Sequence, residues 1–437
     1  MLNKIYLVIG LMFLLACCTT FEEAEQTDRK TFVHFYSSGT DYFSSVAELD
    51  TDQGYIISGQ VRNADGITDA LVIKTDSRGR KVWQKIIPKG VVNAIQPLQN
   101  GYILVGDSIQ LNAGSAQVHE LENTYARLIL MDAKGNIVGH HIKYDSILTT
   151  QNGQDVKLNV DYHGDAVALD PSGNIIVLGS FRIPGQKAQA FVSAFSPDIS
   201  NSLWNVSYIS LDYDFVNCNT VHVTPSANIA WATKMFTQEQ NVSREFLSLP
   251  HVGSNSVHIS NSTFGSTDTR NYSVEDFQKS SAGYCAIGTY SETSGLNANM
   301  YFVRIDANFK IIPESARYID GQELLLNNTI LDGASRTVSV SYDEGMAITA
   351  TDDGYVLAGT LTSTPAVGNG GKDILLVKVD PFGNLLWKKL LGGTGDETVS
   401  SIRLTPDNGL LIFGTNTING LSSMMLLKTD QNGEITN

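Results

Sequence analysis

The histidines are the side chains in this sequence best suited to chemistry, and their spacing does not predict a metal site. Metal sites place His, Cys and carboxylate ligands at short fixed intervals, as in HExxH. His140 and His141 are adjacent, so they would point to opposite sides of a strand. No metal or other cofactor is expected; the alternative is a metal site assembled from distant segments. The eight histidines are His34, His119, His140, His141, His163, His222, His251 and His258.

Motifs for nucleophilic catalysis and for phosphate binding are also missing. The sequence has no GxSxG nucleophile elbow. GNGGK (368–372) and GGTGDE (392–397) are Gly-rich but lack GxxxxGK[ST] and the helix that would receive a phosphate. DTDQGY (50–55) and TDDGY (351–355) resemble the Asp-box of sialidases and a calcium loop only superficially. Turn chemistry explains them better, so no catalytic residue is predicted.

Charge and cysteine content exclude two further classes. The formal net charge is −15 and no Lys/Arg-rich run exists, which argues against nucleic-acid binding. Beyond the N-terminus only Cys218 and Cys285 occur, far apart in the sequence. They predict neither a disulfide framework nor a metal spacing, and we expect both to be buried as small hydrophobic residues.

A repeated strand motif dominates the rest of the chain. Each copy is a turn signal followed by four mostly apolar residues and usually a Gly, which is typical of a strand buried on both faces. The copies recur every 47 to 73 residues. They are QGYIISGQ (53–60), NGYILVGD (100–107), GNIIVLGS (173–180), ANIAWATK (227–234), AGYCAIGT (282–289), DGYVLAGT (353–360) and NGLLIFGT (408–415).

The segments around each copy repeat as well, and together they predict an all-β seven-bladed β-propeller. Each blade would have four strands, named a to d from the ring centre outward, with the motif as strand b. The seventh unit lacks strand d, because the chain stops at KTDQNGEITN. RKTFVHFYSSGTDYFSSVAEL (29–49) aligns without gaps on NLLWKKLLGGTGDETVSSIRL (384–404), which pairs Phe32 with Trp387. The N-terminal strand should therefore complete the last blade and close the ring.

The N-terminus predicts export and lipidation. Lys4 precedes an apolar run, Ile5 to Ala16, that is too short to span a bilayer, and the run ends Leu14-Leu15-Ala16-Cys17. This end resembles the lipobox of bacterial lipoproteins, which implies that Cys17 is acylated; Cys18, or an ordinary signal peptide, is the alternative. The expected organisation is a signal peptide over 1–16, a lipidated acidic linker over 17–29 and one propeller over 30–437.

The whole pattern resembles the lipid-anchored repeat β-propeller lipoproteins of the Bacteroidetes, within the WD40-like and quinoprotein-like propeller group. The acidic residues after Cys17 resemble their surface-export signal, which implies an outer-membrane, surface-exposed protein. A solvated linker is the alternative. The resemblance also implies a TonB-dependent importer with its lipoprotein lid as partner.

Long insertions predict which face binds a ligand. The a–b and c–d turns are short, whereas the insertions, such as 108–125 and 313–345, fall mainly on the opposite face, called here the long-loop face. Aromatic side chains in or beside them could contact a glycan, a peptide or a protein partner, although each could also serve packing. The predicted contacts are Tyr125, Tyr162, Tyr213, Phe236, Tyr290, Tyr318 and Tyr342.

From these observations we expect a non-catalytic binding or scaffold subunit, accessory to a nutrient importer and acting through the long-loop face. The alternative is a propeller hydrolase or lyase acting on a surface polysaccharide or peptide. That alternative requires acidic or His residues from several blades to converge at the central opening. A third class is a structural subunit of secretion or motility machinery.

Overall fold

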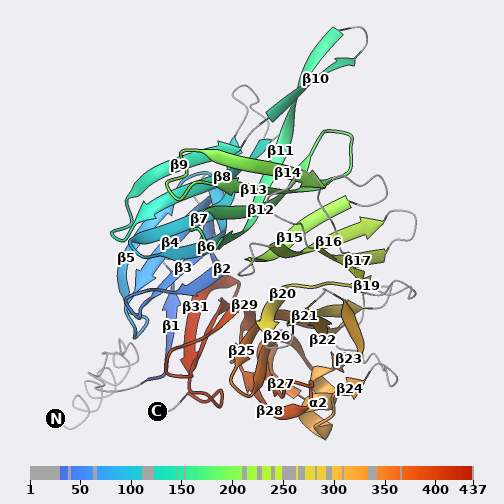
Figure 1. Ribbon diagram of the computed structural model, residues 1–437. Coiled ribbons are helices and arrows are strands. Elements are labelled where there is room, and N and C mark those ends of the chain that lie inside the picture. The colour runs from blue at the N-terminus through green and yellow to red at the C-terminus, as the bar shows by residue number, and fades with distance from the viewer. Residues whose placement is uncertain are drawn as a thin grey trace, which may run out of the picture.

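The computed structural model shows an all-β chain with four-stranded antiparallel sheets arranged as in a propeller (Figure 1). Within the described residues no helix has the length and apolarity needed to cross a membrane. The structure describes residues 30–435 except 38–40, 63–65, 111–122, 144, 152–153, 209–213, 224–228, 238–241, 249–261, 264–270, 281–282, 292–297, 308–309, 333–341 and 365–366.

The first three sheets follow one another along the chain, each built from consecutive antiparallel strands. The first comprises β2 (Tyr42–Leu49), β3 (Tyr55–Arg62), β4 (Thr68–Thr75) and β5 (Lys81–Ile87). The second comprises β6 (Gly90–Leu98), β7 (Gly101–Gln110), β8 (Asn123–Asp132) and β9 (Ile137–Lys143). The third comprises β11 (Gln154–Leu169), β12 (Ile175–Arg182), β13 (Gln189–Phe195) and β14 (Ser202–Tyr208), with β10 (Asp145–Gln151) paired to the first half of β11.

The next three sheets repeat the same order. The fourth comprises β15 (Asp214–Val223), β16 (Ile229–Thr237), β17 (Val242–Ser248) and β18 (Ser262–Thr263). The fifth comprises β20 (Asp276–Ser280), β21 (Gly283–Ser291), β22 (Ala298–Asp306) and β23 (Ile311–Ile319), with short β19 (Asn271–Tyr272) and β24 (Leu331–Asp332) added. The sixth comprises β25 (Asp343–Thr351), β26 (Gly354–Thr364), β27 (Val367–Val379) and β28 (Leu385–Leu391).

The last sheet joins the two ends of the chain. It contains β29 (Asp396–Leu404), β30 (Leu410–Ile418) and β31 (Leu421–Thr429), and β1 (Phe32–Tyr36) pairs antiparallel with β31. Figure 1 shows β1 and β31 side by side. Phe32 lies opposite Lys428, just as Trp387 lies opposite Lys378 in the preceding sheet. The predicted pairing of the N-terminal strand is therefore confirmed in its register.

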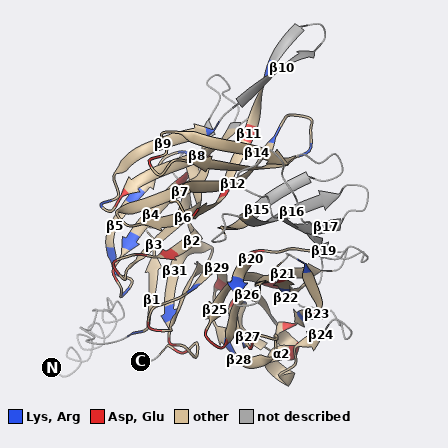
Figure 2. Cartoon of the chain, viewed as in Figure 1, with Lys and Arg blue, Asp and Glu red and all other residues tan. Residues whose placement is uncertain are grey.

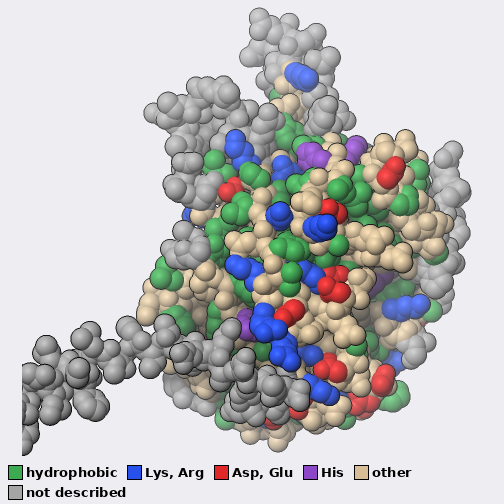
Figure 3. All heavy atoms as spheres, turned by 90° about the vertical axis from the view of Figure 1, so that its left-hand side faces the viewer, with side chains coloured by type: hydrophobic (Ala, Val, Ile, Leu, Met, Phe, Trp, Pro, Cys, Tyr) green, Lys and Arg blue, Asp and Glu red, His purple; other side chains and the backbone are tan. Residues whose placement is uncertain are grey.

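The repeated motif forms the strand that the sequence predicts in every copy, and the side chains that the structure describes on these strands are mostly buried. Apolar side chains from one sheet pack against those of the next, as where Val46 and Ile56 meet Ile95 and Tyr102. Figure 2 shows that Lys, Arg, Asp and Glu are sparse along the strands and frequent near their ends. The face in Figure 3 carries basic and acidic side chains interspersed. The core thus lies within and between the sheets, and the first strands contribute to it with some of their side chains.

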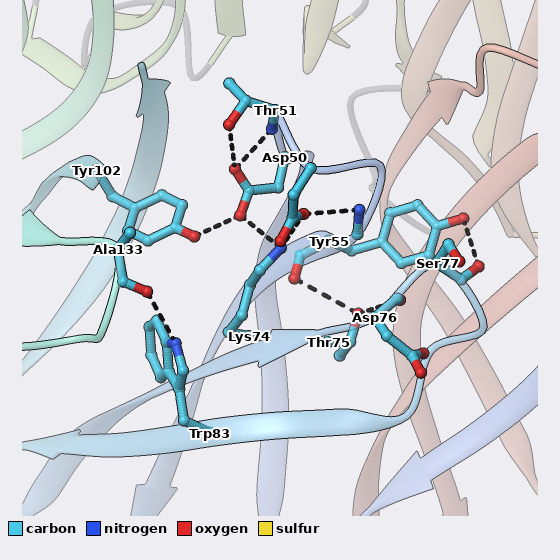
Figure 4. Close-up of polar contacts among 12 residues, drawn as sticks. Asp50, Thr51, Tyr55, Lys74, Thr75, Asp76, Ser77, Trp83, Tyr102 and Ala133 are labelled. Carbon is cyan, nitrogen blue, oxygen red and sulfur yellow. Dashed lines mark hydrogen bonds and ion pairs between the residues drawn. The ribbon is translucent and has the colours of Figure 1, made fainter. Parts of the chain in front are cut away.

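Polar contacts at the short turns hold the first sheet together and join it to the second sheet (Figure 4). Lys74, on β4, is only 4% exposed and its Nζ lies 2.5 Å from Asp50 Oδ2 and 2.5 Å from Asp52 Oδ1. Tyr102, from the second sheet, donates its hydroxyl to Asp50. Trp83 Nε1 donates to the Ala133 carbonyl at 3.1 Å, again between the first and second sheets. These contacts therefore stabilise the turns and the packing of the two sheets, which is a structural role, as the sequence predicts for the Asp-rich turns.

Two regions depart from the sequence expectations. A strands-only chain is expected, but α2 (Gly321–Asn327) forms after Asp320, whose side chain accepts a hydrogen bond from the Glu323 N–H. An N-terminal Asp satisfies amide groups that a short helix leaves unpaired, so the helix forms without a strong amphipathic pattern. The sequence also predicts a long loop over 361–373, between strands b and c of the sixth blade, but much of this segment extends the β26–β27 hairpin.

Candidate functional site

The first strands of the sheets surround a cavity of about 960 Å³. Residues from β2, β6, β11, β15, β20, β25 and β29 all line it, so each sheet contributes its strand a. Strand side chains alternate between two faces, so every second residue of these strands points to the cavity. The lining is rich in acidic, amide and hydroxyl groups, which can bind polar ligands or transfer protons, so the cavity is the candidate functional site.

One row of the lining is set by strand register. Each sheet contributes one residue of its strand a to this row. That residue pairs with the second residue after the Gly or Asn that begins the repeated motif. Glu48 pairs in this way with Ile56, and Arg403 with Leu411. Glu48 and Arg403 thus occupy the same level on the first and last sheets. The row comprises Glu48, Gln96, Ala168, His222, Gln278, Thr349 and Arg403.

An ion pair lies in this row. Arg403 Nε is 3.0 Å from both Oε1 and Oε2 of Glu48, and Nη2 also donates to Oε1. The Arg403 and Glu48 side chains are 26% and 21% exposed, so the pair is partly withdrawn from solvent. Burial alone would lower the pKa of Arg403, but the charge and hydrogen bonds of Glu48 raise it above its ordinary range. Glu48 is therefore hydrogen-bonded to a guanidinium at the cavity wall.

A second carboxyl group lies on the first strand of the fifth sheet, two residues before the row residue Gln278. Asp276, at the start of β20, accepts a hydrogen bond from the Ile348 N–H at 3.1 Å. Burial raises the pKa of Asp276 to about 6, and the negative charge of Glu48 adds to the rise while Arg403 opposes it. Asp276 lies on the fifth sheet and Glu48 on the first, which are not neighbours, yet their charges interact. The cavity thus holds two carboxyl groups in different electrostatic environments.

His222 completes this part of the cavity. Its Nε2 lies 2.6 Å from the Phe277 carbonyl and its ring packs edge-on against the Phe277 ring at 4.7 Å. Burial lowers the pKa of His222, and Arg403 and Lys279 lower it further. A neutral imidazole that donates to a carbonyl is positioned by that bond and presents its other nitrogen as an acceptor.

A third group of polar residues lies nearer the long-loop face. His163 Nδ1 is 3.1 Å from Asp107 Oδ2, and Asp107 Oδ1 accepts from the Gly164 N–H at 2.9 Å. The hydrogen bond with Asp107 raises the pKa of His163, and the charges of Asp107, Asp165 and Asp161 raise it further. The negative charge of the cavity therefore extends from the short-turn end toward the long-loop end.

The ring-bearing residues predicted as ligand contacts do not gather around this cavity. Tyr290 and Tyr318 are 0% and 3% exposed and meet edge to face at 4.8 Å inside the fifth sheet's core. Tyr162 is 8% exposed and stacks on Phe181 at 5.4 Å. Buried rings offer little surface to a ligand, which corrects the expectation for these three residues.

The other residues that the sequence analysis singled out lie in different environments. Tyr342 is 38% exposed, and Tyr125 is partly exposed on β8. The backbone of Phe236 pairs with Asp214 in the fourth sheet. Tyr213 and Cys17 lie outside the described residues. Cys285 is fully buried on β21, as predicted for a small hydrophobic residue.

The sequence interpretation missed Glu48, His222, Asp276 and Arg403. Glu48, His222 and Arg403 occupy equivalent positions before the short a–b turns, and Asp276 lies two residues earlier on its strand. Aligning the first strands as carefully as the second strands would have shown polar or charged residues recurring at the inner row. Within the described residues no group of three or more His, Cys, Asp or Glu is arranged to hold a metal ion.

Comparison with known proteins gives similarity of structure only. No family model matches the chain, and no curated protein matches it. A Trypanosoma rangeli sialidase in complex with 2,3-difluorosialic acid is 9% identical, with a TM-score of 0.42 over 92% of this chain. This chain spans 57% of that protein's length. A Hadza microbial sialidase is 12% identical, with a TM-score of 0.41, over 86% of this chain and 76% of the other. A Dyadobacter fermentans protein of unknown function is 10% identical, with a TM-score of 0.41, over 92% and 98%.

The expectation of a non-catalytic scaffold accessory to an importer is contradicted. The similar structures include sialidases, but a likeness this weak carries no argument about function, and the finding that favours the hydrolase alternative is the cavity itself. The convergence of acidic and His residues from several sheets in one cavity is the condition that this alternative requires. Because the likeness to known structures is weak, the choice between functions depends on the residues of the cavity.

Proposed function

We propose that the protein is a glycoside hydrolase whose active site is the central cavity. The observation that carries the proposal is Asp276, a carboxyl group whose pKa is raised to about 6 beside the Glu48–Arg403 pair. Hydrolysis of a glycosidic bond needs one protonated and one ionised carboxyl group, and enzymes obtain the two states by giving the groups different environments.

In this proposal the two carboxyl groups have different catalytic roles, Asp276 as the general acid and Glu48 as the general base. Protonated Asp276 donates its proton to the glycosidic oxygen as the bond from that oxygen to the anomeric carbon breaks. The carboxylate of Glu48, held by Arg403, takes a proton from the water whose oxygen bonds to the anomeric carbon. His222, fixed by the Phe277 carbonyl, supplies a neutral acceptor for a sugar hydroxyl.

The test is release of reducing ends from a panel of oligosaccharides and polysaccharides by the purified chain. Asp276→Asn keeps the size of the side chain and removes its proton, so turnover should fall at least a hundredfold. Glu48→Gln should lower turnover comparably. The matched controls Asp352→Asn and Glu314→Gln make the same chemical changes at exposed positions outside the cavity lining and should keep full activity. Retention of activity by Asp276→Asn would refute the assignment.

We also propose that the sheets form a closed seven-bladed ring over residues 30–437, with β1 as the outermost strand of the last blade. Two observations support it: the β1–β31 pairing, and the lining of one cavity by seven inner strands. Ser44 and Thr415 bond across the junction of the first and last sheets at 2.9 Å. Small-angle scattering of the chain tests closure, since an open array would give a longer maximum dimension.

We propose further that residues 1–16 are a signal peptide and that Cys17 anchors the protein to the outer membrane, facing the cell surface. The support is the sequence around Cys17 alone. Mass spectrometry of the mature N-terminus tests it, because an acylated Cys at position one is expected. Proteolysis of intact cells then tests surface exposure. The importer with its lid stays a prediction of the resemblance, and the peptide ligand stays a prediction from the aromatic side chains near the long insertions.

A further inference from the structure

The charges of the cavity are strongly unequal. Its lining includes five carboxyl groups and one guanidinium, that of Arg403. The carboxyl groups come from five residues on four sheets, so they surround the space and do not form a local patch. These residues are Glu48, Asp107, Asp165, Glu275 and Asp276.

The guanidinium in the described lining is already engaged. Arg403 donates to both oxygens of Glu48, which is the bidentate geometry in which guanidinium and carboxylate bind best. A sugar carboxylate entering the cavity would have to displace Glu48 from Arg403. It would then leave Glu48 without its partner in a partly buried site, which is costly.

The environment of His163 shows that negative charge acts on the cavity wall formed by the second and third sheets. The pKa of His163 is raised by its hydrogen bond with Asp107 and by the charges of Asp107, Asp165 and Asp161. A group that gains affinity for a proton in this way marks a region that stabilises positive charge. This effect belongs to the second and third sheets, and the first and fifth sheets bring the further acidic side chains Glu48, Glu275 and Asp276 to the lining.

From this charge distribution we infer that the cavity binds amino sugars carrying ammonium groups and excludes sugars carrying carboxylates. This rests on the proposed function, which makes the ligand a glycan. An ammonium group has three donors, and a carboxylate accepts from several, so one sugar can be held by two walls at once. Sialic acid carries a carboxylate, so the inference separates this cavity from that of the sialidases to which the chain is similar.

Calorimetry with three probes at near-neutral pH tests the inference: a glucosamine oligomer, its N-acetylated counterpart of the same length, and sialyllactose. The glucosamine oligomer should bind at least tenfold more tightly than the N-acetylated one, and sialyllactose should not bind. Added salt should reduce the difference, because it screens the charges. Glu275→Gln should weaken binding of the glucosamine oligomer about fivefold and leave the N-acetylated one unchanged, whereas Glu314→Gln should change neither.

The outcomes distinguish this inference from the proposed function. Selective binding of the glucosamine oligomer without any turnover would keep the inference and overturn the hydrolase proposal. Turnover with equal binding of both oligomers, or with tight binding of sialyllactose, would keep the hydrolase proposal and overturn the inference.

Discussion

Arg403 and Glu48 lie 355 residues apart in the sequence, yet Arg403 Nε is 3.0 Å from both carboxylate oxygens of Glu48. Arg403 belongs to β29 and Glu48 to β2, the inner strands of the last and first sheets. The pair therefore joins the two ends of the repeat array at the wall of the cavity. It links the stability of that junction to the charge state of the proposed active site.

Breaking this pair from one side should destabilise the chain. Arg403→Met leaves the partly buried carboxylate of Glu48 without its counter-charge and should lower the free energy of unfolding by about 2 kcal/mol. The double variant Glu48→Gln/Arg403→Met should lose less than the sum of the two single losses. Urea unfolding of the four proteins measures the coupling. Additive losses would show that the two residues do not interact in solution.

Replacing either of two buried lysines at the short turns should lower the free energy of unfolding, by an amount that depends on how deeply the acidic partner is buried. Lys74→Met leaves Asp50, whose side chain is 6% exposed, buried without its counter-charge, and should cost about 3 kcal/mol. Lys378 occupies the equivalent position on β27, but its partner Asp353 is 72% exposed. Lys378→Met should therefore cost about 1 kcal/mol. Thermal unfolding compares them, and equal losses would contradict the dependence on partner burial.

The free energy of unfolding should decrease as the pH rises through the titration of Asp276. The native pKa of this carboxyl group, about 6, lies above its ordinary value of 3.8, so the native state holds the proton more tightly than the unfolded chain. The resulting stabilisation is complete below pH 4 and is lost as the pH rises through 6, by about 3 kcal/mol in all. Asp276→Asn should remove this contribution, so the stability difference between variant and parent should shift in the variant's favour from pH 4 to pH 7. A constant difference would contradict the raised pKa.

Packing between the first two sheets predicts a contrast between two glycines. Gly135 has a φ of +79°, and a methyl group there would meet Lys85 and Trp83 at 3.0 and 3.1 Å. Gly173 has a φ of +81° with no atom within 4 Å of such a group. Gly173→Ala carries the backbone strain alone, about 1 kcal/mol, and Gly135→Ala should cost about 1 kcal/mol more. Denaturant unfolding tests the order, and equal costs would show that the turn does not pack on Trp83.

Much of the fold could be predicted because it depends on local patterns. The motif beginning at Gly54, Gly101 or Gly354 combines turn residues with a short apolar run, and both signals are strong in a single sequence. The pairing of β1 with β31 followed from aligning Phe32 with Trp387, and the structure has that register. Helix α2 was missed because its cap, Asp320, acts through one side-chain bond that no periodicity reveals.

The site was harder to predict because its residues come together only where strands far apart in the sequence line one cavity. Glu48, Asp276 and Arg403 are separated by more than a hundred residues from one another, and no short motif contains two of them. Tyr290 and Tyr318 were expected to meet a ligand because they adjoin long insertions, yet the fifth sheet buries them in its core. Proximity to a loop in the sequence does not decide on which side of a strand a ring points.

The most direct test of the central claim is the pH dependence of kcat/KM on the best glycoside substrate. If Asp276 is the general acid, kcat/KM should fall as the pH rises through about 6, the pKa of the group in the free protein. Asp276→Asn should lose both the activity and this limb of the profile. A kcat/KM that stays constant through pH 6, or an unchanged limb in Asp276→Asn, would contradict the account.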